Sequence, residues 1–154
     1  MTAHTAKDDY RLVIERHFTH PRERVYRAWT ERDALAAWMG PGGMTCDNAE
    51  CDLRVGGRYR LPLVNAEGQT YTAHGEYIEI SAPERLRFTF GWEQPQGGDA
   101  REMLISLSFT ETANGTLMTL VQERLADAEA RDSHRGGWDS SFDCLEAYLA
   151  DSQA

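Results

Sequence analysis

Lysine is almost missing from this 154-residue chain: Lys7 is the only one, and arginine supplies the other cationic side chains. A lysine that forms a Schiff base or holds a phosphate group inside a folded domain is therefore nearly excluded. The net charge of -9 also disfavours nucleic acids and anionic membrane surfaces as partners, because both would repel the chain at long range.

Long apolar runs are missing too. No stretch approaches the roughly 18 consecutive apolar residues of a membrane span. Residues 1–9 lack the basic start and apolar stretch of a secretion signal, and we expect them to be flexible. The sequence therefore predicts a cytoplasmic protein. With 41% hydrophobic residues, we expect a single domain over 1–154 with an ordered core over about 10–151.

Cysteine is scarce and odd in number, with three residues. In a reducing compartment these stay free thiols, so no disulfide is expected. Cys46 and Cys51 are five positions apart, which places them on opposite faces of a regular strand. No second Cys or His pair completes a zinc set. We expect no metal and no cofactor, and we interpret the cysteines as small buried apolar side chains.

The first half of the chain opens with a strand and two short helices. Residues 10–18 alternate between apolar and polar side chains, as a strand does. Pro21 suits the first position of a helix. Thr30 and Asp33 have the spacing of a capping box, which predicts a second helix over Glu31–Trp38. Gly40, Gly42 and Gly43 end it.

Strand and turn signals fill the middle of the chain. Gly56-Gly57 and Asn114-Gly115 are hairpin signatures. The segment 94–100, with proline and two glycines, predicts a mobile loop. Six further strands are expected at 44–55, 58–64, 70–80, 85–92, 101–110 and 116–125.

The last amphipathic segment, 128–149, predicts one long helix, with Asp127 as its N-cap. Gly136 and Gly137 each weaken a helix by about 1 kcal/mol. Two explanations stay open: the helix approaches the sheet closely, or space is left beside Trp138 for a ligand. The apolar stripe follows steps of four, three and four residues: Trp138, Phe142, Leu145 and Leu149.

This order of elements predicts an α+β architecture. About seven strands form a curved antiparallel sheet around the C-terminal helix, the only element long enough to cover its apolar face. A twisted sheet and a straight helix diverge, so we expect a void at one end, and we look for function there.

Several segments carry a resemblance to a known family. They are Val25–Thr30, Trp38–Gly42, Asp52–Gly57, Gly75–Ile80 followed by Pro83–Leu86, and His134 with Gly137-Trp138. Together they resemble the SRPBCC or START-like superfamily, which has the helix-grip fold of the birch pollen allergen, and within it the homologues of the activator of the heat-shock-protein-90 ATPase. The resemblance implies a fold with a pocket and does not imply one reaction.

Six side chains are expected to line that pocket. Each tryptophan has a plainer alternative as core packing. Gln122 shares a face with Met118 and Leu120, so it must hydrogen-bond inside the protein or reach a ligand. The six candidates are Trp38, Tyr59, Trp92, Gln122, Trp138 and Phe142.

Other polar candidates are weaker. His74 and Glu76 share a strand face and could serve as an acid and base. No nucleophile accompanies them, and the alternative is that this face is exposed to solvent. His134 is expected to hydrogen-bond a neighbouring loop rather than to act as a base. No catalytic set emerges.

Three functions compete. The favoured hypothesis is a binding module, a carrier or sensor for a small apolar or amphipathic molecule held between sheet and helix. The second is a cyclase-like or dehydratase-like enzyme that uses Gln122 and Tyr59 to orient its substrate, against which stands the missing catalytic set. The third is a chaperone-associated interaction domain, as the family name suggests. A homodimer stays open.

Overall fold

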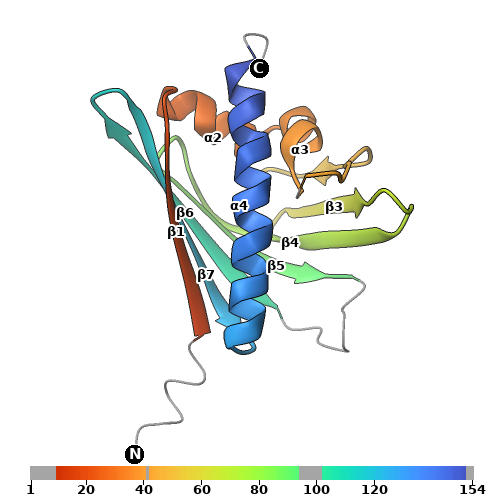
Figure 1. Ribbon diagram of the computed structural model, residues 1–154. Helices are drawn as coiled ribbons and strands as arrows, with labels where there is room; N and C mark the ends of the chain where they lie inside the picture. The colour runs from red at the N-terminus through yellow and green to blue at the C-terminus, as the bar shows by residue number, and fades with distance from the viewer. Residues whose placement is uncertain (1–9, 41, 94–101, 152–154) are drawn as a thin grey trace, which may run out of the picture.

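A curved antiparallel sheet lies against one long helix in the computed structural model, which describes residues 10–40, 42–93 and 102–151 (Figure 1). The predicted flexible segment 1–9 and the predicted mobile loop 94–100 lie outside these ranges. The elements are β1 (Tyr10–Phe18), α2 (Arg22–Thr30), α3 (Arg32–Trp38), β2 (Glu50–Cys51), β3 (Arg58–Val64), β4 (Thr70–Ser81), β5 (Arg85–Trp92), β6 (Met103–Thr112), β7 (Gly115–Leu125) and α4 (Ala128–Ala150). The predicted α+β helix-grip architecture is confirmed.

The seven strands follow the order β1-β7-β6-β5-β4-β3-β2, and every neighbouring pair is antiparallel. Strands β2 to β7 are therefore a meander, while β1 crosses over to pair with β7. The two short helices α2 and α3 occupy the connection between β1 and β2 and lie beside the C-terminal half of α4 (Figure 1).

The inner face of the sheet is apolar because alternate residues of each strand point toward α4. Burial of such a side chain stabilises the fold by about 1.5–3 kcal/mol. On β5 and β6 the buried set is Leu86, Phe88, Phe90, Met103, Ile105, Leu107 and Phe109, each at most 6% exposed.

Helix α4 begins where the sequence predicted. The side chain of Asp127 accepts a hydrogen bond from the backbone N–H of Ala130 at 2.8 Å, which satisfies a donor that the helix itself cannot. Its stripe is buried as expected: Phe142, Leu145 and Leu149 are fully covered and Trp138 is 5% exposed. Within the described ranges, no helix is long and apolar enough to cross a membrane.

The predicted strand over 44–55 is wrong. Only Glu50–Cys51 forms a strand, and Thr45 makes a single bridge to Val64. Asp47 and Asn48 form a turn between them, as these residue types favour. Because no regular strand joins Cys46 to Cys51, the argument that they face opposite ways also fails. Cys46 is 1% exposed and Cys51 is partly buried, and both are free thiols.

The predicted helix starts need correction as well. Pro21 is the N-cap of α2 rather than its first helical residue. The N-cap of α3 is Glu31, and no side chain caps it, so the predicted capping box does not form. The hydroxyl of Thr30 instead donates to the carbonyl of Tyr26 at 3.2 Å, inside the preceding helix.

The hairpin between β6 and β7 forms, but one residue earlier than its signature predicted. Thr112 pairs with Gly115, which leaves Ala113 and Asn114 as the two-residue loop. Glycine is needed at 115 for two reasons. Its φ is +154°, and a Cβ there would collide with the carbonyl oxygen of Phe18 on β1.

A β-bulge shapes the end of β7. Leu12 pairs with Gln122 and Tyr10 with Leu125, so β7 has one residue more than β1 between these pairs. Arg124 lies in this bulge with φ +72°, an uncommon conformation for a side chain other than glycine. The extra residue returns Leu125 to the inner face, where it is 2% exposed.

Helix α4 also holds the free edge of the sheet. Arg16 on β1 donates to Asp143 and Glu146 at 2.6 and 2.8 Å. Arg135 reaches the Val13 carbonyl oxygen at 3.5 Å. The helix thereby lies against an edge strand whose unpaired backbone groups could otherwise pair with another chain.

Candidate ligand-binding cavity

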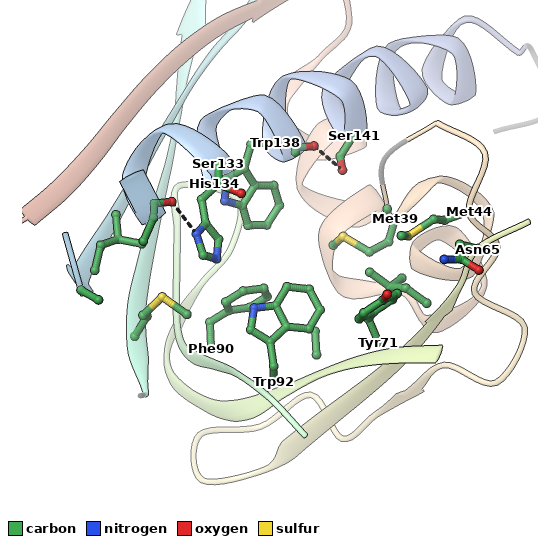
Figure 2. Close-up of a pocket in the computed structure, with 18 residues that line it drawn as sticks. Met39, Met44, Asn65, Tyr71, Phe90, Trp92, Ser133, His134, Trp138 and Ser141 are labelled. Carbon is green, nitrogen blue, oxygen red and sulfur yellow. Dashed lines mark hydrogen bonds between the residues drawn. The ribbon is translucent and has the colours of Figure 1, made fainter. Parts of the chain in front are cut away.

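A cavity of about 540 Å³ separates the N-terminal half of α4 from β3, β4 and β5 (Figure 2). Small-molecule pockets usually measure about 300–1,000 Å³. Its lining comes from the helix, the sheet and the segment after α3: Met39, Gly40, Met44, Leu63, Asn65, Tyr71, Ala73, Phe90, Trp92, Met103, Leu125, Ala126, Ala130, Ser133, His134, Gly137, Trp138 and Ser141.

The cavity exists because α4 presents small side chains to it. Ala130, Ser133, Gly137 and Ser141 follow one another at steps of three, four and four residues and all line the space. A Cβ added to Gly137 would meet nothing within 4 Å. Of the two explanations for the paired glycines, close approach of the helix is therefore wrong, and open space beside Trp138 is what the structure has.

The opposite wall is aromatic and rich in sulfur. Phe90 and Trp92 lie edge to face with ring centroids 5.3 Å apart, and Figure 2 shows both across the cavity from the helix. Three of the five methionines, Met39, Met44 and Met103, contribute flexible polarizable side chains. Such walls can adapt to flat apolar molecules.

Of the six predicted site residues, the cavity is lined by two, Trp92 and Trp138. The other four pack behind its wall. Trp38 donates its indole N–H to the Ala28 carbonyl at 2.8 Å and is 2% exposed. Phe142 stacks on Trp138 with centroids 5.5 Å apart and is fully buried.

Tyr59 packs behind the cavity wall, opposite Gly75 across β3 and β4. A Cβ at Gly75 would crowd the Tyr59 ring, so glycine leaves room for the phenol to donate to the Thr89 carbonyl at 2.6 Å. Full burial raises the pKa of Tyr59 well above its usual 10. Tyr59 therefore stays a neutral hydroxyl that supports the wall.

Gln122 controls the position of Trp138. The indole N–H donates to Gln122 Oε1 at 2.8 Å, and Gln122 Nε2 donates to Met103 Sδ at 3.2 Å. Gln122 is fully buried, and both ends of its amide have partners. Of the alternatives that the sequence left open for Gln122, the internal hydrogen bond is the one that forms. These two hydrogen bonds connect the cavity residues Trp138 and Met103 through Gln122, which lies behind them.

His134 lies in the cavity wall, which the sequence did not predict. Its Nδ1 is 2.9 Å from the carbonyl oxygen of Ala130 in the same helix, not in a neighbouring loop. Its ring is 6.5 Å from that of Phe90, and Figure 2 shows it directed into the cavity. The signal was available: Ala130, His134, Gly137 and Ser141 recur at helical spacing along one face.

The remaining polar candidates lie elsewhere. His74 and Glu76 are on the strand face that points away from α4, where Arg58 approaches them at 3.5 and 3.8 Å. Burial raises the pKa of Cys46 to about 11, which keeps it a neutral thiol. Over residues 10–40, 42–93 and 102–151, no group of three or more His, Cys, Asp or Glu side chains is placed to hold a metal ion.

A curved antiparallel sheet around a long C-terminal helix, with a cavity between them, defines the helix-grip class of the SRPBCC superfamily. Within that class, the chain belongs to the Activator of Hsp90 ATPase homolog 1-like protein family, whose profile matches residues 19–150. The resemblance predicted from the sequence is confirmed.

Solved structures agree with this assignment. A protein from Chromobacterium violaceum is 33% identical, with a TM-score of 0.82 over 89% of this chain and 94% of that one. The AHSA1 protein of Silicibacter pomeroyi is 28% identical, with a TM-score of 0.81 over 92% and 98%. A Nitrosomonas europaea protein shares the fold at 23% identity, with a TM-score of 0.78 over 93% and 96%. No curated protein matches the chain.

Proposed function

We propose that this protein is a binding module that holds a small, largely apolar molecule in the cavity between α4 and the sheet. The observation that supports this most is the lining. Among the 18 described residues that line the cavity there is no lysine, arginine, aspartate or glutamate, and His134 is the only histidine. A charged ligand would lose its hydration there without gaining a counter-charge, so an uncharged one is favoured.

The proposed carrier or sensor role also draws on how firmly the walls are held. Trp138 is hydrogen-bonded to Gln122 and stacked on Phe142, so one wall is fixed before any ligand arrives. A pre-formed site loses less conformational entropy on binding than one that must be ordered. We place this role in the cytoplasm, in keeping with the three free thiols.

Two glycines of α4 provide a matched test. Gly137 lines the cavity, whereas Gly136, its neighbour, is exposed and outside the lining, and a Cβ at either meets nothing within 4 Å. Either residue changed to leucine gains about 0.5–1 kcal/mol of helix propensity. Only Gly137→Leu places its side chain in the cavity. We expect it to abolish binding of the uncharged fluorophore N-phenyl-1-naphthylamine, while Gly136→Leu binds it as the wild type does.

Fluorescence titration of the three proteins decides the matter, with thermal melting as the check on folding. Binding by the wild type and by Gly136→Leu, and loss of binding in a folded Gly137→Leu protein, supports the proposal. If the wild type takes up no probe, or if both variants bind equally well, the cavity is not a binding site. If the proposal is supported, native mass spectrometry of freshly purified protein measures the mass of any ligand that the cavity retains.

A further inference from the structure

The polar groups of the cavity differ in how many of their hydrogen-bond donors and acceptors already have a partner within the protein. Asn65 uses its amide inside the β3–β4 turn: Nδ2 donates to Gln69, and Oδ1 accepts from the backbone N–H groups of Glu67 and Gln69. Tyr71 donates its hydroxyl to Gln69 at 3.4 Å, and Ser141 donates to the Gly137 carbonyl at 2.9 Å. The hydroxyl protons of Tyr71 and Ser141 and most of the Asn65 amide are therefore already committed.

His134 differs from these groups, because its contacts determine which ring nitrogen can still accept a hydrogen bond. A carbonyl oxygen can only accept, so the contact between Nδ1 and the Ala130 carbonyl requires the proton on Nδ1. In the neutral ring, Nε2 then carries no proton and can only accept. No side chain or backbone group in the described part of the protein donates to it.

The cavity around that acceptor is largely apolar. Phe90, Met103 and Leu125 are among its lining residues, and the centroid of the Phe90 ring lies 6.5 Å from that of the His134 ring. An acceptor in such a setting favours a ligand that brings a donor, since an apolar group placed against it would leave it unpaired. Trp138, Phe90 and Trp92 provide flat surfaces for the remainder of that ligand.

We propose that the ligand is an uncharged aromatic molecule with a hydroxyl group, a phenol being the simplest class, and that this hydroxyl donates a hydrogen bond to Nε2 of His134. The inference rests on the proposed function and deepens it. His134 then decides which of two equally apolar molecules is held more tightly.

Two probes of nearly equal apolar area isolate the hydrogen bond: 2-naphthol, and 2-methoxynaphthalene, in which the donor is methylated. Tryptophan fluorescence quenching gives both dissociation constants. In the wild type we expect 2-naphthol to bind about five-fold more tightly, the effect of one hydrogen bond. His134→Phe keeps a flat ring and removes the acceptor, so the preference should disappear while 2-methoxynaphthalene still binds.

Two further variants complete the design. His134→Gln carries an amide oxygen that can take the place of Nε2, and it should keep most of the preference. His17→Phe, on the outer side of β1 where His17 bonds Thr112 at 2.9 Å, should behave as the wild type.

The outcomes separate the two proposals. Preference in the wild type and in His134→Gln, with none in His134→Phe, supports the role of His134. Equal binding of both probes by the wild type, or a preference that survives in His134→Phe, overturns that role and leaves the binding module standing. If neither probe quenches the folded wild type, the binding function itself fails and the inference fails with it.

Discussion

The two halves of α4 face the same sheet, but one packs tightly against its surroundings and the other lines a cavity. From Phe142 to Leu149 the inward side chains are large and fully buried, and they pack against the sheet and the two short helices. From Ala130 to Gly137 they are small except for His134, and the space they leave is a cavity of about 540 Å³. Trp138 stands at the boundary, stacked on Phe142 on one side and exposed to the cavity on the other.

The difference shows that side-chain size along one stripe can divide a single interface into a core and a site. The packed half stabilises the fold through burial, and the hollow half forgoes that stabilisation. Each of the following substitutions tests whether the division is real.

The largest effect is expected where the packed half is opened. Phe142→Ala should lower the free energy of unfolding by about 3–5 kcal/mol, because a fully buried ring leaves a void that the surroundings fill only in part. Ser141→Ala, one residue away on the cavity side, should change it by less than about 1 kcal/mol, since its hydroxyl bonds only within the helix. Urea denaturation measures both. Similar losses would mean that the two halves are packed alike.

A smaller effect is expected at the boundary. Gln122→Leu leaves the Trp138 N–H buried without its acceptor, which should lower stability by about 1–3 kcal/mol. In a Trp138→Phe background the donor is absent, and the same substitution should then have a clearly smaller effect. A double-mutant cycle measured by chemical denaturation gives the coupling. No coupling would show that Gln122 does not hold the indole in place.

The smallest effect is expected at the bulge that turns Leu125 toward the cavity. Arg124 has φ +72°, which glycine adopts without penalty and β-branched residues adopt least readily. Arg124→Gly should leave thermal stability unchanged or raise it by up to about 1 kcal/mol, whereas Arg124→Val should lower it by about 1–2 kcal/mol. Equal melting temperatures for the two variants would contradict the positive φ.

Sequence patterns predicted the packed half better than the hollow one. Hydrophobic periodicity predicted the buried stripe of α4, which is Trp138, Phe142, Leu145 and Leu149. The bounds of strands β1 and β5 were also predicted to the residue. The cavity gave a weaker signal: the paired glycines indicated space beside Trp138, but side chains as small as those of Ala130 and Ser133 do not mark which residues line it. Large aromatic residues were therefore assigned to the site, and two of them, Trp38 and Phe142, belong to the core.

Other failures have local causes. The pairing of Gly56-Gly57 suggested a tight hairpin, but Cys51 pairs with Tyr59 and the backbone N–H of Gly57 donates to the Arg54 carbonyl, so a longer loop joins β2 to β3. Gln122 looked like a ligand contact since nothing in the sequence reveals that the Trp138 indole and the Met103 sulfur lie beside it. Whether a buried polar side chain bonds within the protein or reaches a ligand therefore depends on partners that are distant in the chain.

The pairing of β1 with β7 constrains how this protein folds during its synthesis. Leu12 lies opposite Gln122 and Phe18 opposite Thr116, so the first strand finds its neighbour only after the whole meander has been made. At about 5–20 residues per second on a ribosome, β1 waits for roughly 5–20 s with both edges unpaired. Strands in that condition invite pairing with other nascent chains. Arg11 and Glu15, exposed in the finished sheet, place a charge on that waiting strand on either side of Val13 and would oppose such pairing during synthesis.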